Sequence, residues 1–298
     1  MPASRSTRKC RRTRSSNNGP DLNKRLRFAR GLFFARETIK STKTIDFVFF
    51  FFLYSKSNGL GMFFGPRMFN GVSMSDYESA LGQIPFYRVR PFLAPFVGRR
   101  YASPSHRKLL IIGESHYAPE GDTLHHNVEG WYDGSTKVTE ALPLYWNCYT
   151  RKTFAEWNSG RFSKTVLGEL GNLFQTENPA EEVAFYNYFL RPADNRQSFV
   201  KICTERDREM SAKTFACVLK ALSPDVVCFA SYDAIQCAEA DFPKFCGRRL
   251  WDDNGHVFYV NHPAHSWWNR ATRPEYFHGL TSREFFREQL SENWLLKI

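Results

Sequence analysis

A short polar segment directly after an apolar run is the first place where chemistry is expected. Residues 108–121, KLLIIGESHYAPEG, present a carboxylate, a hydroxyl, an imidazole and a phenol in succession, from Glu114, Ser115, His116 and Tyr117. A carboxylate and an imidazole exchange protons with reacting groups near neutral pH and can orient a water molecule. We therefore interpret Glu114, Ser115 and His116 as candidate catalytic residues.

Two further polar clusters occur at apolar runs. The run EVAFYNYFL places Asn187 between Tyr186 and Tyr188, and the run HVFYVNHP carries Asn261 and His262 and continues as AHSWWNRATR. In open parallel sheets, ligands bind outside the carboxyl ends of the strands. We expect these polar groups to meet there and to form one small-molecule site on an apolar scaffold.

The elements that must position these residues are short strands alternating with helices. Four apolar runs rich in β-branched and aromatic residues are near-continuous rather than alternating, at residues 108–113, 182–190, 224–231 and 256–263. Such runs are typical of strands buried on both faces. The pattern predicts an α/β fold with a mostly parallel four-stranded central sheet, in one domain from about Met74.

The intervening segments have helical periodicity. Apolar residues recur on one face of residues 162–174, and a second helix is expected with Ser211 as its N-cap. A shorter helix is expected in YDAIQCAEA, residues 232–240. Thr281 and Glu284 form a capping-box pattern that predicts the start of the last helix.

The net charge of +11 is concentrated at the N-terminus. Residues 1–73 hold 15 of the 41 Lys and Arg and 3 of the 30 Asp and Glu, which leaves 26 basic and 27 acidic residues in the remainder. Nucleic-acid binding therefore cannot be inferred from the overall charge. A surface for DNA would have to be a local patch.

Residues 1–73 differ in composition from the rest of the chain. SRSTRKCRRTRSSNNG has no apolar period, which predicts a disordered basic extension. The run DFVFFFFLYS is too short to span a bilayer, so no membrane association is expected. One interpretation is a non-native extension ahead of a true start at Met62, Met68 or Met74. The other is an organelle transit segment, which shares the Arg- and Ser-rich, acid-poor composition.

The seven cysteines are scattered and form no C-x-x-C pair. Cys217 and Cys228 fall in apolar patterns that predict buried thiols. This spacing disfavours an iron–sulfur cluster or a zinc knuckle and suggests a reducing intracellular compartment, cytoplasm or nucleus. We expect no metal and no cofactor.

A planar heterocyclic base would use every group of the predicted site. The Asn187 amide offers a donor and an acceptor to a Watson–Crick edge, and Tyr117 or Tyr186 would stack on the base. Glu114 would orient or activate a water near the sugar C1′. His262 would donate to a base oxygen that gains charge as the glycosidic bond breaks.

The motifs that carry these residues resemble the uracil-DNA glycosylase superfamily. The resemblance spans residues 108–295 and rests on LLIIGESHY, VAFYNYFLRP, LSPDVVCFAS and NHPAHSWWNR. It implies a three-layer α/β/α sandwich in residues 74–298. It also implies hydrolysis of uracil or a modified pyrimidine from a nucleotide flipped out of single- or double-stranded DNA, by a monomer without a metal.

The resemblance assigns roles in the first motif residue by residue. Gly113 and Glu114 match the Gly-Glu of the Gly-Glu-Ala-Pro-Gly form of that motif. In the Gly-Gln-Asp-Pro-Tyr-His form, a water-activating Asp stands where this chain has Ser115, and His116 replaces the proline of both forms.

The later motifs match more closely. Asn187 stands where the family reads the pyrimidine edge, and His262, Pro263 and Ala264 match its His-Pro-Ser/Ala motif. Beyond that motif the family inserts a wedge side chain into the minor groove, a role for one tryptophan here, while two arginines would bind phosphates. The residues expected to contact DNA are Ala264, His265, Trp267, Trp268, Arg270 and Arg273.

Two alternatives stay open. One is a nucleobase- or nucleotide-binding module without hydrolysis, which the near-neutral body and Ser115 favour. The other is a hydrolase similar to the erythromycin-esterase type, in which Glu114 and His116 act on an ester. In that case His125 and His126 would join the site or bind a metal.

Overall fold

A computed structural model describes residues 74–138, 145, 148–156, 160–195, 197–250 and 255–296. All of them belong to one unit, residues 67–298. The expectations for residues 1–73 fall outside the described residues. Among the residues that the structure describes, no helix is both long and apolar enough to cross a bilayer.

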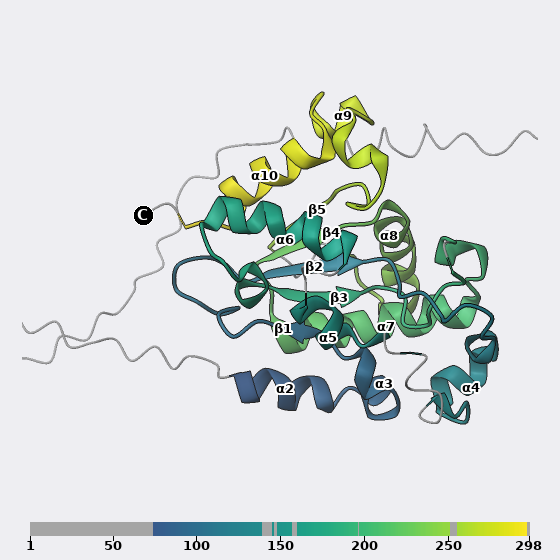
Figure 1. Cartoon of the computed structure of the whole chain (residues 1–298). Helices are drawn as coiled ribbons and strands as arrows, with labels where there is room; N and C mark the ends of the chain where they lie inside the picture. The colour runs from purple at the N-terminus through teal and green to yellow at the C-terminus, as the bar shows by residue number, and fades with distance from the viewer. Residues whose placement is uncertain are drawn as a thin grey trace, which may run out of the picture. The chain divides into compact units, whose positions relative to one another are not determined.

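The described chain is an α/β fold built on one sheet (Figure 1). Its strands are β1 (Phe96–Val97), β2 (Leu109–Gly113), β3 (Ala184–Asn187), β4 (Val226–Phe229) and β5 (His256–Tyr259). Its α-helices are α2 (Met74–Gly82), α3 (Pro85–Val89), α4 (Val128–Asp133), α5 (Thr150–Ala155), α6 (Arg161–Phe174), α7 (Glu205–Leu222), α8 (Tyr232–Cys246), α9 (Pro274–Phe277) and α10 (Ser282–Asn293). Short 3₁₀ turns are η1 (Pro91–Leu93), η2 (Leu124–His126), η5 (Pro179–Glu182), η6 (Phe199–Lys201) and η7 (Ser266–Asn269).

The sheet has five strands in the order β1-β3-β2-β4-β5, so the prediction of four strands is wrong. The four strands expected from the sequence are β2, β3, β4 and β5, and they pair in parallel. The additional strand β1 pairs with β3 antiparallel through two residues only, Phe96 opposite Phe185 and Val97 opposite Ala184. A strand of two residues has no periodicity that a sequence pattern can reveal.

Helices cover both faces of the sheet, as Figure 1 shows with α5 and α6 in front of it and α7 behind. On the α6 side, Leu109 and Ile111 of β2 join a core with Val166 of α6 and Phe285 of α10. On the α7 side, alternate residues such as Leu110 join a core with residues of α7 and α8. Since successive side chains of a strand point to opposite faces, β2 is buried on both. This explains its unbroken apolar sequence.

The starts of α7 and α10 follow their capping residues. The predicted capping box is confirmed at α10, where Thr281 and Glu284 bond each other's backbone N–H groups. The N-cap predicted at Ser211 is wrong, because α7 begins two turns earlier with a capping box of Thr204 and Asp207. The first turns of α7 are largely polar, so its apolar period becomes visible only after Ser211, which is fully buried inside the helix.

Of the two cysteines predicted to be buried, one is buried and the other is exposed. Cys228 is buried in β4 as expected, whereas Cys217 is exposed on α7. Its neighbour Val218 turns into the core, and in a helix the next residue along the chain lies about 100° around the axis.

Candidate functional site

The carboxyl ends of β2 and β3 meet at Gly113 and Asn187, which are paired in the parallel register. A Cβ atom built on Gly113 would lie 2.2 Å from Oδ1 of Asn187 and 3.2 Å from Cζ of Phe185. Glycine is therefore the residue at position 113 that leaves room for the Asn187 amide. That amide is half-buried and has no hydrogen-bond partner among the described residues, so it is available to a ligand.

His262 follows the end of β5 and is held as a neutral imidazole. Its Nδ1 accepts from the backbone N–H of Ala264 at 3.3 Å, which puts the remaining ring proton on Nε2. Burial, together with the charge of His265, lowers the pKa of His262 to about 4. At neutral pH the ring therefore presents Nε2–H as a hydrogen-bond donor.

Aromatic rings connect His262 to the Asn187 strand, and the sequence analysis did not select them. The ring of Phe162 on α6 lies 5.2 Å from His262 and 5.6 Å from Phe185, between centroids. Phe185 also stacks on Phe154 of α5 at 4.3 Å with an interplanar angle of 2°. Phe185 precedes Asn187 by two residues and so shares its strand face, a spacing that the sequence does contain.

Glu114 points to the other face of the sheet. Its Oε1 accepts from the Ser198 hydroxyl at 2.7 Å and from the backbone N–H of Phe199 at 2.8 Å. Its Oε2 accepts from the hydroxyl of Ser231, the N-cap of α8, at 3.5 Å. Burial raises the pKa of Glu114, and the hydrogen bonds from Ser198 and Phe199 counteract that rise. The residue faces α8, whereas Asn187 lies on the α6 side.

The remaining residues of the first motif have different surroundings. Nε2 of His116 lies 2.9 Å from Oγ1 of Thr150 on α5. Tyr117 is 48% exposed and could stack on a ligand. Ser115 is half-buried and has no side-chain hydrogen bond to another described residue.

Two predicted ligand contacts are corrected by burial. Tyr186 is 1% exposed, and its ring stacks on Phe215 of α7 in the core on the α7 side, so it cannot stack on a base. Trp268 is 2% exposed and packs against Phe286 of α10, so it is a core residue and not a wedge. Each belongs to an apolar stretch whose burial depends on helices distant in the sequence.

The Arg273 side chain contacts other residues of the protein. Its guanidinium lies 3.3 Å from the ring centroid of Tyr232 and donates to Oδ1 of Asn261 at 3.3 Å. These contacts compete with the predicted role on a phosphate. The side chain ties the loop after β5 to α8.

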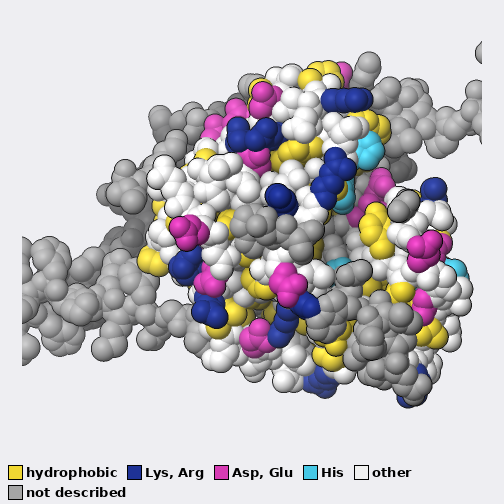
Figure 2. Space-filling view, viewed as in Figure 1, with side chains coloured by type: hydrophobic (Ala, Val, Ile, Leu, Met, Phe, Trp, Pro, Cys, Tyr) yellow, Lys and Arg dark blue, Asp and Glu magenta, His cyan; other side chains and the backbone are white. Residues whose placement is uncertain are grey.

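The loop that contains η7 keeps the other predicted DNA contacts near the surface. Trp267 is 48% exposed, His265 and Arg270 are exposed, and Ala264 is partly exposed. His265 caps η7 by accepting from the backbone N–H of Trp267. Figure 2 shows Lys and Arg side chains interspersed with Asp and Glu over the face that it presents, rather than one broad basic patch.

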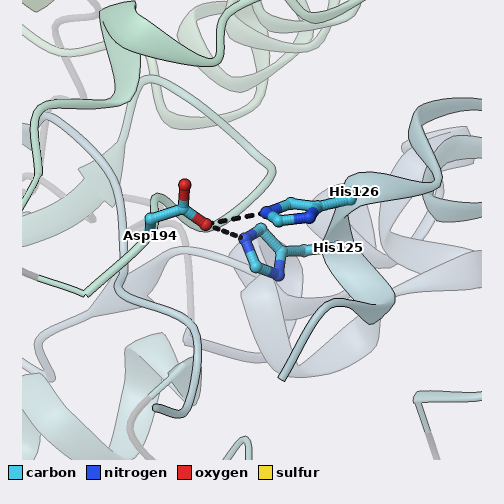
Figure 3. A group of neighbouring side chains, drawn as sticks. All are labelled: His125, His126 and Asp194. Carbon is cyan, nitrogen blue, oxygen red and sulfur yellow. Dashed lines mark hydrogen bonds and ion pairs between the residues drawn. The ribbon is translucent and has the colours of Figure 1, made fainter. Parts of the chain in front are cut away.

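A second polar cluster joins His125 and His126 of η2 to Asp194 (Figure 3). Nε2 of each histidine donates to the same oxygen, Oδ1 of Asp194, at 2.8 Å. The three side chains line a pocket of about 470 Å³. The sequence analysis linked the two histidines only to the esterase alternative and did not select Asp194.

Comparison with models of known protein families and with curated proteins finds no match for this chain. The resemblance to the uracil-DNA glycosylase superfamily therefore rests on its four motifs and stays a prediction.

Proposed function

We propose that residues 74–298 form a DNA base glycosylase that hydrolyses the N-glycosidic bond of a flipped nucleotide carrying uracil or a modified pyrimidine. The observation that supports it best is the unpartnered Asn187 amide, for which Gly113 makes room, on the sheet face toward which neutral His262 also lies. The proposal includes the three-layer α/β/α sandwich of that superfamily, with β1 as an added edge strand.

Base recognition follows from the half of the site on the α6 side. The Asn187 amide pairs with the Watson–Crick edge of the base, because it offers a donor and an acceptor side by side. The rings of Phe162 and Phe185 supply the apolar wall of this half. An amide that a bound base covers rejects bases with the wrong edge, because its own donor or acceptor would be left without a partner.

Bond cleavage uses His262 and Glu114 in separate roles. The C1′–N bond breaks with its electron pair going to the base, and Nε2–H of His262 stabilises the negative charge that forms on the base oxygen. The carboxylate of Glu114 stabilises the oxocarbenium-like sugar through its charge, positions the water that attacks C1′ and accepts the proton that this water loses. The base anion then takes up a proton from solvent. Oε2 of Glu114 is the oxygen assigned to the water, since its one hydrogen bond, from the Ser231 hydroxyl, is long at 3.5 Å.

Binding of DNA is assigned to the loop that contains η7. Trp267 and Arg270 are exposed there, which suits a wedge and a phosphate contact. The described cysteines are free thiols, which supports a reducing intracellular compartment.

The test is cleavage of labelled single- and double-stranded DNA that carries uracil, hypoxanthine, thymine opposite guanine, or hydroxymethylated cytosine. The full chain is scored for alkali-labile abasic sites, beside Glu114→Gln, Asn187→Ala and His262→Ala. His278→Asn, at an exposed position on another loop, is the control. Cleavage of one substrate that the three site variants lose and the control keeps would establish the activity. Absence of abasic sites on every substrate from folded protein would refute it.

A second candidate is a base-binding module without hydrolysis. Glu114 accepts three hydrogen bonds from within the protein. These bonds favour the binding module, because they give the carboxylate a structural role that needs no catalysis. This candidate predicts binding of the same oligonucleotides without cleavage, lost in Asn187→Ala and retained in Glu114→Gln. The esterase alternative receives no such support, since His116 is bonded to Thr150.

A further inference from the structure

The His125–His126–Asp194 cluster has the composition and the spacing of a metal site. One ligand atom from each residue lies within 4.8 Å of the other two. Figure 3 shows both rings directed at Asp194, although the two histidines are consecutive in the chain. Ligand bonds of about 2.0–2.2 Å in a tetrahedral site place neighbouring ligand atoms about 3.3 Å apart. The two Nε2–Oδ1 distances in the cluster are 2.8 Å. Each must therefore lengthen by about 0.5 Å for an ion to lie between the three ligand atoms.

The proton positions also suit a metal. His125 is fully buried, and its Nδ1 has no hydrogen-bond partner among the described residues. Moving the ring proton from Nε2 to Nδ1 therefore costs only the bond to Asp194, which a metal bond would replace.

The pocket beside the cluster has acidic residues in its described wall. Its wall includes the carboxylates of Glu120, Asp122 and Asp194 as well as both imidazoles. No Lys or Arg is found among the described residues that line it. The side chains of His126 and Asp194 are 48% and 29% exposed, so an ion can enter from solvent and keep open coordination positions.

We propose that His125, His126 and Asp194 bind a divalent transition-metal ion, with Zn²⁺ as the first probe. Two imidazole nitrogens with one carboxylate oxygen favour such ions over Mg²⁺ or Ca²⁺, which prefer oxygen ligands. The site lies outside the proposed base site and goes beyond the proposed glycosylase activity.

Metal binding would stiffen the loop that follows β2. The backbone N–H of Ala118 donates to the carbonyl of Ala193, and the N–H of Ala193 donates to the carbonyl of His116. These bonds fix residue 118 beside Ala193, and Asp194 follows Ala193 in the chain. An ion bound by Asp194, His125 and His126 would fix the other end of residues 118–125 to the same segment. The ion thereby supports the backbone that carries His116 and Tyr117.

The test uses the full chain, freed of any affinity tag, reduced and stripped with a chelator. Zn²⁺ binding is measured by calorimetry and by metal content after dialysis, and Co²⁺ binding by its visible d–d absorption. The variants are His126→Ala and Asp194→Asn, and Asp194→Asn keeps an acceptor oxygen for the two histidines. His278→Asn is the control, because His278 is exposed, lies outside the cluster and has a φ of 54° that asparagine tolerates.

Wild type and His278→Asn should each bind one equivalent, and their melting temperatures should rise with Zn²⁺. Both cluster variants should bind more than about 100-fold more weakly, since loss of even a supporting group costs about 10- to 100-fold. Equal affinity and stoichiometry in wild type and the cluster variants would overturn the proposal, as would no binding by folded wild type. The assay contains no substrate, so it can fail or succeed independently of the glycosylase test.

Discussion

Gly113 and Asn187 face each other across β2 and β3 so closely that a Cβ on residue 113 would lie 2.2 Å from Oδ1 of Asn187. The neighbouring side chain, and not the backbone conformation, requires glycine at position 113, since the φ of Gly113 is not positive. The position of the Asn187 amide thus depends on the absence of one methyl group on another strand.

Gly113→Ala should therefore displace the amide and weaken base binding by about 10- to 100-fold, as expected for the loss of about 1–3 kcal/mol of hydrogen bonding. The matched control is Gly168→Ala in α6, where an added Cβ meets nothing within 4 Å. That change should raise stability by about 0.5–1 kcal/mol and leave binding unchanged. Oligonucleotide affinity and thermal melting measure the two effects. Wild-type affinity in Gly113→Ala would contradict the assignment of Asn187.

His262 should make stability depend on pH between about 6.5 and 4. Its pKa is about 4 in the folded state, because burial opposes the charged form, and about 6.5 in the unfolded chain. Below pH 6.5 the His262 ring binds a proton in the unfolded state but not in the folded state. The contribution of His262 to the free energy of unfolding therefore falls with falling pH, by roughly 2–3 kcal/mol in total. The difference in unfolding free energy between wild type and His262→Asn, measured from pH 7 to pH 4, should show this slope. A difference that is constant with pH would show that His262 is not buried as described.

The two neighbours of Glu114 should shift its pKa in opposite directions. Ser198 lowers the pKa of Glu114 by hydrogen bonding, and the charge of Asp233 raises it. Since the ionised carboxylate is the form proposed to act, Ser198→Ala should move the acid limb of the pH–rate profile to higher pH. Asp233→Asn should move it to lower pH. Shifts in the same direction for both variants would rule out Glu114 as the group that titrates.

Trp267 and Trp268 are adjacent but should behave differently on truncation. Trp268→Ala removes a fully buried ring and should cost about 3–5 kcal/mol of unfolding free energy. Trp267→Ala removes an exposed ring and should change stability by less than about 0.5 kcal/mol. It should weaken DNA binding, because stacking on an aromatic side chain is worth about 1–3 kcal/mol. Chemical denaturation and oligonucleotide binding test the pair, and unchanged DNA binding in Trp267→Ala would remove Trp267 from the interface.

The buried ion pair of Arg191 and Asp207 should be far more sensitive than a surface pair. Arg191 donates two hydrogen bonds to Asp207 and one to the carbonyl of His125, and both side chains are at most 2% exposed. Asp207→Ala should cost about 3–5 kcal/mol, because it leaves a buried charge without its partner. Lys213→Ala, which breaks the exposed pair with Glu209, should cost less than about 0.5 kcal/mol. Similar melting temperatures for the two variants would contradict this difference.

Much of the fold follows from local pattern. The apolar runs of β2 and β4, the helix face of α6 and the capping box of α10 are contained in segments of at most about 14 residues. The apolar pattern sets the two strands and α6, and two capping residues set the start of α10, so a sequence pattern suffices. Strand β1 could not be predicted in this way, because its pairing with β3 defines it. The start of α7 is also local, but its capping residues Thr204 and Asp207 lie two turns before the visible apolar period, and the sequence analysis did not select them.

For the candidate site, too, part could be predicted from the sequence and part could not. The sequence by itself determined that Gly113 and His262 stand near strand ends, since the apolar run before each of them stops there. That β3 ends at Asn187 was decided by the structure, because the apolar run continues to Leu190. Only the tertiary structure decided that Glu114 faces α8 while Asn187 lies on the α6 side, and that Tyr186 and Trp268 are core residues. It also decided that Asp194 meets two histidines 68 and 69 residues earlier in the chain. The reason is physical: the type of a side chain and its place along a strand are local properties. Its partners are set by which helix covers which face of the sheet.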